Sequence, residues 1–572
     1  MYKMKWSLVL SLLLIGFSTL AQNPAQESFE LLKRIQPLKA KKSIEQIVSN
    51  NPSPENYFYL GQFNLKIKEF NDAEAAFKKG IELDPKNDFI LNQVGLISVD
   101  VAKGKVDEAK PKFDQILADT KEKDLDVIYR IAEAYEMFYE LGQDEKFKNN
   151  NPGEALRLIS LIESKISKKF PALLPEHFEV RGDAYLVMND GGNAVSAYEQ
   201  VLRLNPSDLN VKTKIATVYL RGKNYKETQV RYREILESDS TFAPAIKKYG
   251  EYLIIGGQYK NASNFFRKYL KYSEPSPEDI LETAKLLFLS KDYQGSMEYT
   301  QKAESLGVKD ADIARMKGYS RVELGEYQEG LANLTLMKNQ GTKPYYLDDY
   351  YFGKAYQGLG EEDKAIEYYN LAAPLDTNNN IYSIIHEIYF KNKDFVQASE
   401  YGEKMIQWKS ERKTDIGSGD YFRVGLDYYY ATAYTESSDT LKRMELGTKG
   451  MGMFNEAIKI NGKWPPFYIS KARLNRILDF EGKGIWAPDY LDFIRVIDEL
   501  KADNSTNYTA DKNQIFEAYK ALGGYYLGYE SDEQKADNYF KLALEIKPDD
   551  TQILDHFKSK EEKSTDIRKV EE

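Results

Sequence analysis

Residues 182–216 read GDAYLVMNDGGNAVSAYEQVLRLNPSDLNVKTKIA, and the spacing of small residues in this stretch decides the fold. Gly182 opens the stretch and Ala216 closes it 34 residues later, and small residues keep this spacing at five consecutive positions. These positions are Gly182, Ala216, Gly250, Ala284 and Gly318. A fixed period of roughly 20–50 residues indicates a chain built from structural repeats.

Two further classes of residue follow the same period. Twelve residues after each small position comes a second small one: Ala194, Thr228, Ala262, Ser296 and Gly330. Four residues later stand Tyr198, Tyr232, Phe266, Thr300 and Leu334. Two antiparallel helices approach closely only where side chains are small, and a large side chain fills the space beside them. Pro206 ends the second helix, because proline cannot continue one. The pattern therefore predicts helical hairpins, which stack because one hairpin cannot bury its apolar face alone.

This pattern resembles the tetratricopeptide repeat. The first unit carries the signature residues Tyr57, Leu60, Gly61, Ala73, Phe77, Gly80 and Pro85, and the last carries Gly524, Ala536, Phe540, Ala543 and Pro548. The resemblance implies an all-α fold, an α-solenoid (superhelix) of about 12 tetratricopeptide-like helical hairpins between residue 50 and residue 556.

The repeat, the N-terminal residues and the charged C-terminus together predict how the chain is divided. We expect a signal peptide at 1–21, a lead-in segment at 22–50 with a helix over 26–49, and a regular solenoid at 51–415. Less regular hairpins follow at 416–556, and a charged tail at 557–572. Within 416–515 we expect a hairpin of 421–434 with 454–460, joined by a long connection, and a second of 465–479 with 488–500.

The first 22 residues have the layout of a secretory signal peptide. Lys3 and Lys5 give a basic start, residues 8–17 form an apolar run, and Ala21 precedes the expected cleavage point. The run is shorter than the roughly 20 residues that a spanning helix needs, which favours cleavage over an uncleaved anchor. The chain has no cysteine to carry a lipid, so a lipid anchor is excluded. We expect an exported protein, in the periplasm or at the outer membrane through partners, with no direct membrane insertion.

Composition excludes several classes of function. The net charge is −10, so the totals give no strongly basic stripe for a nucleic acid. Without cysteine there is no disulfide, thiolate metal site or cysteine nucleophile. There are only three histidines, and no metalloprotease, serine hydrolase or phosphate-loop motif occurs. We therefore predict no catalytic residue, no cofactor and no metal.

The resemblance implies where a protein partner binds. In such solenoids the first helix of each hairpin, helix A, lines the concave face. The implied contacts are the residues three before and one after each small position. They are Phe58, Gln62, Glu179, Asp183, Thr213, Thr217, Lys247, Glu251, Leu281, Lys285, Arg315 and Tyr319. The Lys/Asn/Arg cluster with which some relatives hold a C-terminal carboxylate is absent, so that mode of binding is not expected.

A third position on helix A, four residues after the small one, is apolar in unit after unit. It holds Leu65, Val99, Leu186, Leu220, Ile254, Phe288 and Val322. Such a stripe packs against the next hairpin or, alternatively, receives a partner segment.

These features favour a non-catalytic scaffold or adaptor of the bacterial cell envelope that binds partner proteins through the solenoid surface. One alternative is a periplasmic chaperone or peptide-binding receptor that uses the concave groove. Another is an enzyme with a site in 416–515, where Trp464, Trp486 and Asp489 lie near Pro/Gly turns.

Overall fold

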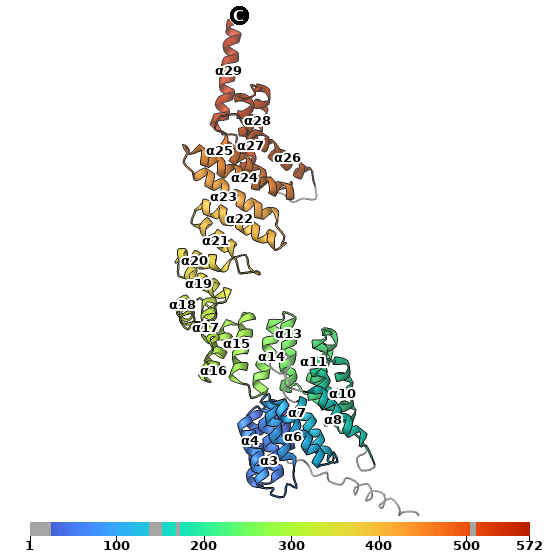
Figure 1. The fold of residues 1–572 in the computed structure, drawn as a ribbon. Helices are drawn as coiled ribbons and strands as arrows, with labels where there is room; N and C mark the ends of the chain where they lie inside the picture. The colour runs from blue at the N-terminus through green and yellow to red at the C-terminus, as the bar shows by residue number, and fades with distance from the viewer. Residues whose placement is uncertain (1–24, 137–150, 168–171, 504–510, 572) are drawn as a thin grey trace, which may run out of the picture. The chain divides into compact units, whose positions relative to one another are not determined.

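The computed structural model describes residues 25–136, 151–167, 172–503 and 511–571. Within these ranges all regular structure is helical, in 29 helices without a strand (Figure 1). The prediction of an all-α solenoid is confirmed, and the helices from α3 to α28 follow one another as 13 hairpins against the 12 or so expected. The predicted leader at 1–21 lies outside the described residues.

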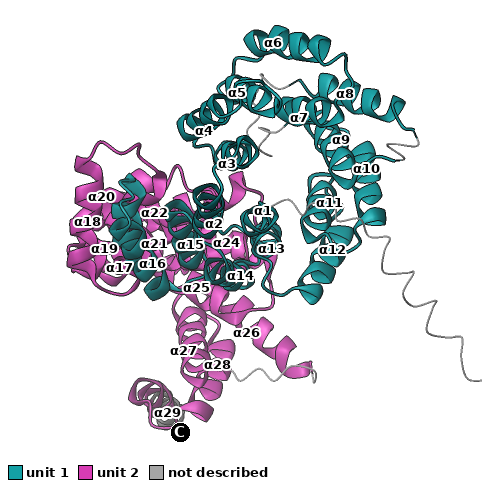
Figure 2. Cartoon of the chain, turned by 90° about the horizontal axis from the view of Figure 1, so that it is seen from below, with its two compact units in different colours: residues 1–320 teal, residues 321–572 magenta. Residues whose placement is uncertain are grey.

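The chain forms two compact units, residues 1–320 and 321–572 (Figure 2). Unit 1 contains α1 (Gln26–Lys33), α2 (Pro37–Asn50), α3 (Pro54–Lys66), α4 (Phe70–Glu82), α5 (Leu91–Ala102), α6 (Val106–Asp119), α7 (Leu125–Glu136), α8 (Pro152–Ser164), α9 (Pro175–Val187), α10 (Gly191–Leu204), α11 (Leu209–Arg221), α12 (Tyr225–Ser238), α13 (Ala243–Ile255), α14 (Tyr259–Tyr272), α15 (Pro277–Leu289) and α16 (Tyr293–Ser305). The boundary falls inside α17 (Ala311–Glu323).

Unit 2 continues the alternation of first and second helices, A and B. It contains α18 (Tyr327–Asn339), α19 (Tyr346–Gly358), α20 (Glu362–Ala372), α21 (Ile381–Lys391), α22 (Phe395–Glu411), α23 (Ser418–Tyr434), α24 (Thr440–Ile460), α25 (Pro465–Leu478), α26 (Ala487–Ala502), α27 (Lys512–Gly528), α28 (Glu533–Ile546) and α29 (Thr551–Glu571). The expected tail at 557–572 thus continues helix α29 as far as Glu571.

The turn between helices A and B recurs with the period of the repeat. Asn189, Lys223, Gly257, Lys291 and Gly325 each have a positive φ and stand 34 residues apart. A left-handed residue of this kind ends a helix, which explains where helix A stops. At three of these turns the next residue caps helix B with its side chain: Asp190, Asn224 and Asp292.

The small positions lie where they bring the two helices of a hairpin together. A Cβ added at Gly250 would lie 2.8 Å from the Phe266 ring, and one at Gly182 would overlap the Tyr198 ring. In the last hairpin the contact with Phe540 is made by Gly523, whereas Gly524 faces open space. The sequence assignment of Gly524 to this position is therefore wrong by one residue, because the turn between α27 and α28 is one residue longer than in the regular units.

This register shift predicts opposite effects for two adjacent substitutions. We expect Gly523→Ala to lower the free energy of unfolding by about 1–3 kcal/mol, because the added methyl overpacks against Phe540. Gly524→Ala should be neutral or stabilise by up to about 1 kcal/mol, because alanine costs less backbone entropy in a helix. Urea unfolding of both variants measures the difference, and equal effects would contradict the assignment of the register.

The lead-in segment forms two helices instead of the single one expected over 26–49. α1 ends at Lys33, and Pro37 occupies the first turn of α2, where its missing N–H costs nothing. Between them the chain turns sharply at Ile35, which has φ +57°. Proline at 37 together with this turn explains why one continuous helix does not form.

A second correction concerns residues 421–460. The long connection expected there is wrong, because residues 440–453 belong to α24, which runs for 21 residues. Of the three glycines at 447, 450 and 452 in this helix, two serve close packing. A Cβ at Gly450 would lie 2.9 Å from Leu474, and one at Gly447 would overlap Leu478. The hairpin predicted at 465–479 and 488–500 is confirmed as α25 and α26.

A candidate binding cavity in unit 1

A cavity of about 860 Å³ lies on the inner side of the helices of unit 1. Its size falls within the roughly 300–1,000 Å³ that is usual for ligand sites. Apart from Lys68, every lining residue comes from the α1 segment or from the helices A named α3, α7, α9, α11 and α13. The lining is mixed: acidic and basic side chains lie beside Tyr59, Tyr129 and several apolar residues.

The α1 segment lies between α2 and α13 and closes the circle of hairpins in unit 1 (Figure 2). On one side α1 and α2 pack on Phe63 of α3, in the first hairpin. On the other side Ile35 packs on Ala243, Ile246 and Tyr269 of the sixth hairpin, α13 and α14. The two ends of this arc of hairpins are therefore joined through the N-terminal helices.

Polar contacts also join the segment between α1 and α2 to the sixth hairpin. We call this set of contacts, made by residues 34–39 with Asp239, Tyr272 and Glu274, the N-terminal clasp. Arg34 Nη2 lies 2.7 Å from Asp239 Oδ2, and the Glu274 backbone N–H donates to the Ile35 carbonyl at 2.8 Å. The Glu274 carboxylate accepts from the backbone N–H of Leu38 at 2.7 Å and of Lys39 at 3.3 Å. Partners in the clasp stand up to 236 residues apart in the sequence.

Ile35 holds a backbone conformation that a β-branched residue rarely adopts. Its φ of +57° costs about 1–2 kcal/mol relative to an ordinary conformation. Such strain persists only where surrounding contacts enforce it. The hydrogen bond from Glu274 and the apolar contacts of the side chain provide that enforcement.

Removing the polar part of the clasp should free the N-terminal helices locally. For the double variant Arg34→Ala with Glu274→Ala we expect hydrogen exchange in residues 26–39 to rise about 10- to 100-fold, because each lost contact is worth roughly 0.5–1.5 kcal/mol. Exchange in α9 to α12 should stay unchanged. Glu278→Ala, an exposed acidic residue of α15 outside the clasp, is the control. Unchanged exchange in 26–39 would show that the apolar contacts alone hold the segment.

The first charged group of the cavity joins α3 to α7. The Glu133 carboxylate lies 3.0 Å from Lys66 Nζ and 2.6 Å from Arg130 Nη1, and its side chain is only 7% exposed. Burial alone would raise the pKa of Glu133, but the two cations outweigh burial and lower that pKa to about 2. Glu133 is therefore ionised in the folded protein at neutral pH.

The second charged group joins α9 to α11. Lys214 Nζ lies 2.8 Å from Glu179 Oε1 and 2.6 Å from Asp183 Oδ2, and the Tyr198 hydroxyl donates to Asp183 Oδ1 at 2.5 Å. Burial would lower the pKa of Lys214, but the Asp183 and Glu179 carboxylates raise it well above its usual value. This lysine is thus held by both carboxylates in its charged form.

Further along the wall, α13 contributes two more ion pairs. Lys247 Nζ lies 2.6 Å from Asp279 Oδ1, and Lys248 Nζ lies 2.8 Å from Glu251 Oε2. The cavity therefore carries many charges, and most of them are paired with one another.

The structure brings together seven of the twelve predicted contact residues. Gln62, Glu179, Asp183, Thr213, Thr217, Lys247 and Glu251 line the cavity. Phe58, Leu281 and Tyr319 are buried, with at most 3% of each exposed. Lys285 and Arg315 both pair with Asp312. Partner contact by any of the twelve stays a prediction.

Other lining residues were missed from sequence, and some of them had a usable signal. The rule of three before and one after, applied to the small residue Ala132, gives Tyr129 and Glu133, and both line the cavity. Ile35 and Lys33 carry no repeat signal, because they lie in the lead-in segment. Of the apolar stripe, Leu65, Val99 and Leu186 are buried, as contact with a neighbouring hairpin requires.

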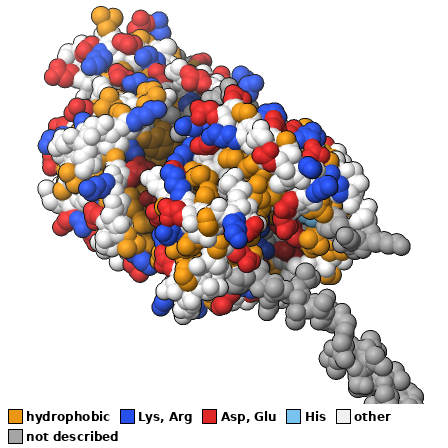
Figure 3. All heavy atoms as spheres, turned by 60° about the horizontal axis from the view of Figure 1, so that its bottom comes forward, with side chains coloured by type: hydrophobic (Ala, Val, Ile, Leu, Met, Phe, Trp, Pro, Cys, Tyr) orange, Lys and Arg blue, Asp and Glu red, His pale blue; other side chains and the backbone are white. Residues whose placement is uncertain are grey.

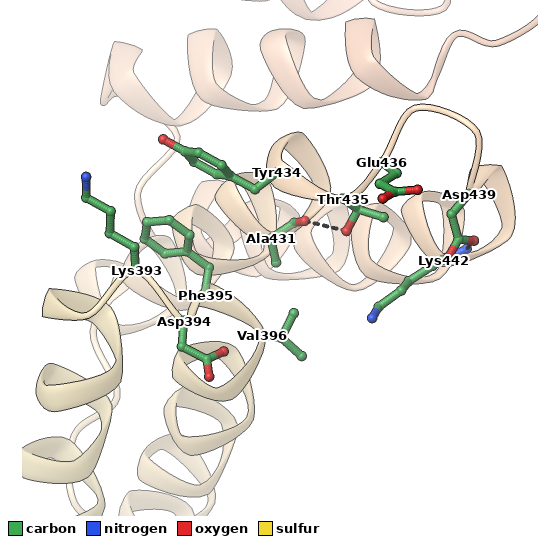
Figure 4. A pocket seen from close by; sticks show the side chains of 10 residues that line it. All are labelled: Lys393, Asp394, Phe395, Val396, Ala431, Tyr434, Thr435, Glu436, Asp439 and Lys442. Carbon is green, nitrogen blue, oxygen red and sulfur yellow. Dashed lines mark hydrogen bonds between the residues drawn. The ribbon is translucent and has the colours of Figure 1, made fainter. Parts of the chain in front are cut away.

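Unit 2 has a smaller cavity of about 340 Å³ between the start of α22 and the turn from α23 to α24 (Figure 4). Phe395 and Tyr434 stack there with ring centroids 5.4 Å apart, and Tyr434 is 71% exposed. Elsewhere in this unit His386 is buried, and its Nε2 lies 2.8 Å from Asp427 Oδ2.

Trp464, Trp486 and Asp489, on which the enzyme alternative rests, make structural contacts in the described part of unit 2. Asp489 lies 3.0 Å from Lys471 Nζ and accepts from Asn475 at 2.5 Å. The Trp486 indole N–H donates to Asp479, and Trp464 packs on Phe467. Asp489, Trp486 and Trp464 are thus each used in an ion pair, a hydrogen bond or a packing contact.

The described residues were also compared with what a charged interface, a membrane span or a metal site requires. Acidic and basic side chains are interspersed on the face drawn in Figure 3. Among the described helices none combines the length and the apolarity needed to cross a membrane. In the same ranges, no three His, Asp or Glu residues converge as metal ligands would.

Comparison with known proteins identifies the repeats. The model of the tetratricopeptide repeat matches residues 54–87 and 352–379, and that of anaphase-promoting complex, cyclosome, subunit 3 matches 256–335. The chain therefore contains tetratricopeptide repeats, and proteins built from them generally bind other proteins.

Three relatives show how far the similarity reaches. DnaJ homolog subfamily C member 3 of Bos taurus is 20% identical over 272 residues, 43% of this chain and 53% of that protein. Hsp70-Hsp90 organizing protein of Triticum aestivum is 22% identical over 278 residues, 44% of this chain and 47% of that protein. The chain thus matches about half the length of each. The C-terminal part of a TPR repeat-containing protein from Cytophaga hutchinsonii is 23% identical, with a TM-score of 0.33 over 48% of this chain and 98% of that structure.

Proposed function

We propose that this chain, with its tetratricopeptide repeats, is a non-catalytic scaffold or adaptor of the bacterial cell envelope that binds a partner protein in the cavity of unit 1. One observation carries the binding part: helices A, which are remote in sequence, converge on one cavity of about 860 Å³. The apolar and charged lining suits a peptide segment, which offers both kinds of group. The setting in the envelope rests on the leader pattern at 1–22.

Site-specific photocrosslinking tests this function. A photoreactive phenylalanine replaces Asn210, which lines the cavity, and in a matched variant replaces Glu199, which is exposed on helix B of the neighbouring hairpin, α10. Irradiation in envelope extract should give one dominant crosslinked partner from position 210 and much less from position 199. Crosslinking of equal yield from both positions, or no crosslinking from position 210, would contradict binding in the cavity.

A second candidate is a periplasmic chaperone or peptide-binding receptor that holds segments of unrelated clients in the same cavity. The two curated relatives favour it, since one is named as a DnaJ homolog and the other as an organizer of Hsp70 and Hsp90. This candidate differs in its selectivity. A chaperone should suppress the aggregation of unrelated unfolded proteins and bind them weakly, in a salt-sensitive way. A scaffold should be recovered with one partner and should leave the aggregation of other proteins unchanged.

A further inference from the structure

One position of the cavity departs from the repeat. Four residues after the small position the seven units of the stripe carry an apolar side chain, but after Ala132 this position holds the acidic Glu136, and after Gly353 it holds the neutral Gln357. Glu136 ends the described part of α7, lines the cavity and is only 9% exposed. A carboxyl group is therefore buried at a place where an apolar residue would satisfy the packing of the repeat.

The charges around Glu136 are already committed to other partners. Lys66 and Arg130 both bond to Glu133, and Lys214 bonds to Glu179 and Asp183. Within the described residues, Glu136 makes no hydrogen bond or ion pair. Glu133, Glu179 and Asp183 each bond to a cation, and Glu136 is the one of these four carboxyl groups that does not. Burial first and the Asp183 charge second raise the pKa of Glu136 well above its usual value.

A buried carboxyl group without a partner is costly, and a bound cation would remove that cost. At the Glu136 end of the cavity, an anionic ligand would meet Glu136, Asp183 and Glu179 and would have to displace Lys214 from two carboxylates. An apolar ligand would leave Glu136 unpaired. The apolar wall formed by Val180, Leu186 and Val187 also suits an alkyl stem that ends in a charge.

We propose that the cavity of unit 1 binds a lysine or arginine side chain of the partner segment, with its cationic head group at the carboxyls of Glu136 and Asp183. This specificity rests on the proposed function, since it names the chemistry of the segment that the cavity receives. Glu136 is then the residue that selects a basic partner.

Two blocked amino acids of matched length test the proposal on the full chain. N-acetyl-lysine methylamide and N-acetyl-norleucine methylamide differ in the charged end of the side chain, and saturation-transfer NMR titration measures their weak affinities. We expect the lysine probe to bind at least about 10-fold more tightly than norleucine, because a desolvated charge pair adds more than 1.4 kcal/mol. Glu136→Gln should reduce this preference to less than about twofold.

Two controls make the result decisive. Asp126→Asn removes the same charge from an exposed position of α7 outside the cavity and should keep the preference. Circular dichroism should show Glu136→Gln folded, because the amide replaces an unpaired carboxyl of the same shape. Equal affinity of the two probes for wild type, or a preference that survives Glu136→Gln, would overturn the proposal. Crosslinking at position 210 without a preference for lysine would refute this specificity and leave the proposed function standing.

Discussion

Phe77→Ala should lower the free energy of unfolding by about 3–5 kcal/mol. The Phe77 side chain is fully buried, and its ring faces two glycines, Gly61 of α3 and Gly95 of α5. It therefore fills both the centre of the first hairpin and the joint with the second. Because the backbone at two glycines cannot move in to fill the space, most of the cavity left by the substitution should persist.

Urea unfolding of the full chain measures this effect, and hydrogen exchange locates it. Exchange should rise in α3, α4 and α5, because a stacked repeat loses its own stability and that of its interface. Leu83→Ala, at a residue 41% exposed just after α4, is the control and should change stability by less than about 1 kcal/mol. A loss below about 1 kcal/mol for Phe77→Ala would show that this contact does not hold the hairpins together.

Glu133→Gln is expected to cost about 3 kcal/mol at neutral pH. The pKa of Glu133 falls from an ordinary value near 4.5 to about 2 in the folded chain, and each unit is worth about 1.4 kcal/mol. A lowered pKa stabilises the fold above the unfolded value, near 4.5, and this stabilisation is lost as the pH falls through the folded value. The difference between wild type and variant should therefore shrink by more than half by about pH 3.

Chemical unfolding of both proteins at pH 7 and pH 3 checks the sign. Asp114→Asn, which removes an exposed ion pair with Lys110, serves as the control and should cost less than about 1 kcal/mol at either pH. A difference that stays constant with pH, or grows in acid, would contradict the assignment of Glu133 as an ionised carboxylate between Lys66 and Arg130.

Much of the fold was predictable because it is local. Gly182, Ala216 and Gly250 report close helix contact at a constant period, and that contact defines the hairpins. The same logic failed by one residue at Gly523, where the turn lengthens, and in α24, where glycines that serve packing resemble a loop. A glycine required by a neighbouring side chain and one required by a turn look alike in a sequence.

The candidate site was predictable only in part. The residues on the regular helices A, such as Asp183 and Thr217, followed from the repeat. The same rule would also have given Tyr129 and Glu133 if it had been applied to Ala132. The clasp had no sequence signal, because Arg34 and Asp239 stand 205 residues apart and Arg34 lies outside the repeated units. Closure of the cavity is a long-range property that no local pattern encodes.

The clasp also has a consequence for the order in which the chain folds. Residues 34–39 precede Glu274 by about 235 residues, so the N-terminal helices are available to fold before their clasp partner is. Until then the apolar side of the first helix has only its immediate neighbours to cover it. The chain therefore passes through a folding intermediate in which the clasp has not yet formed. A chaperone could bind the N-terminal helices at that stage.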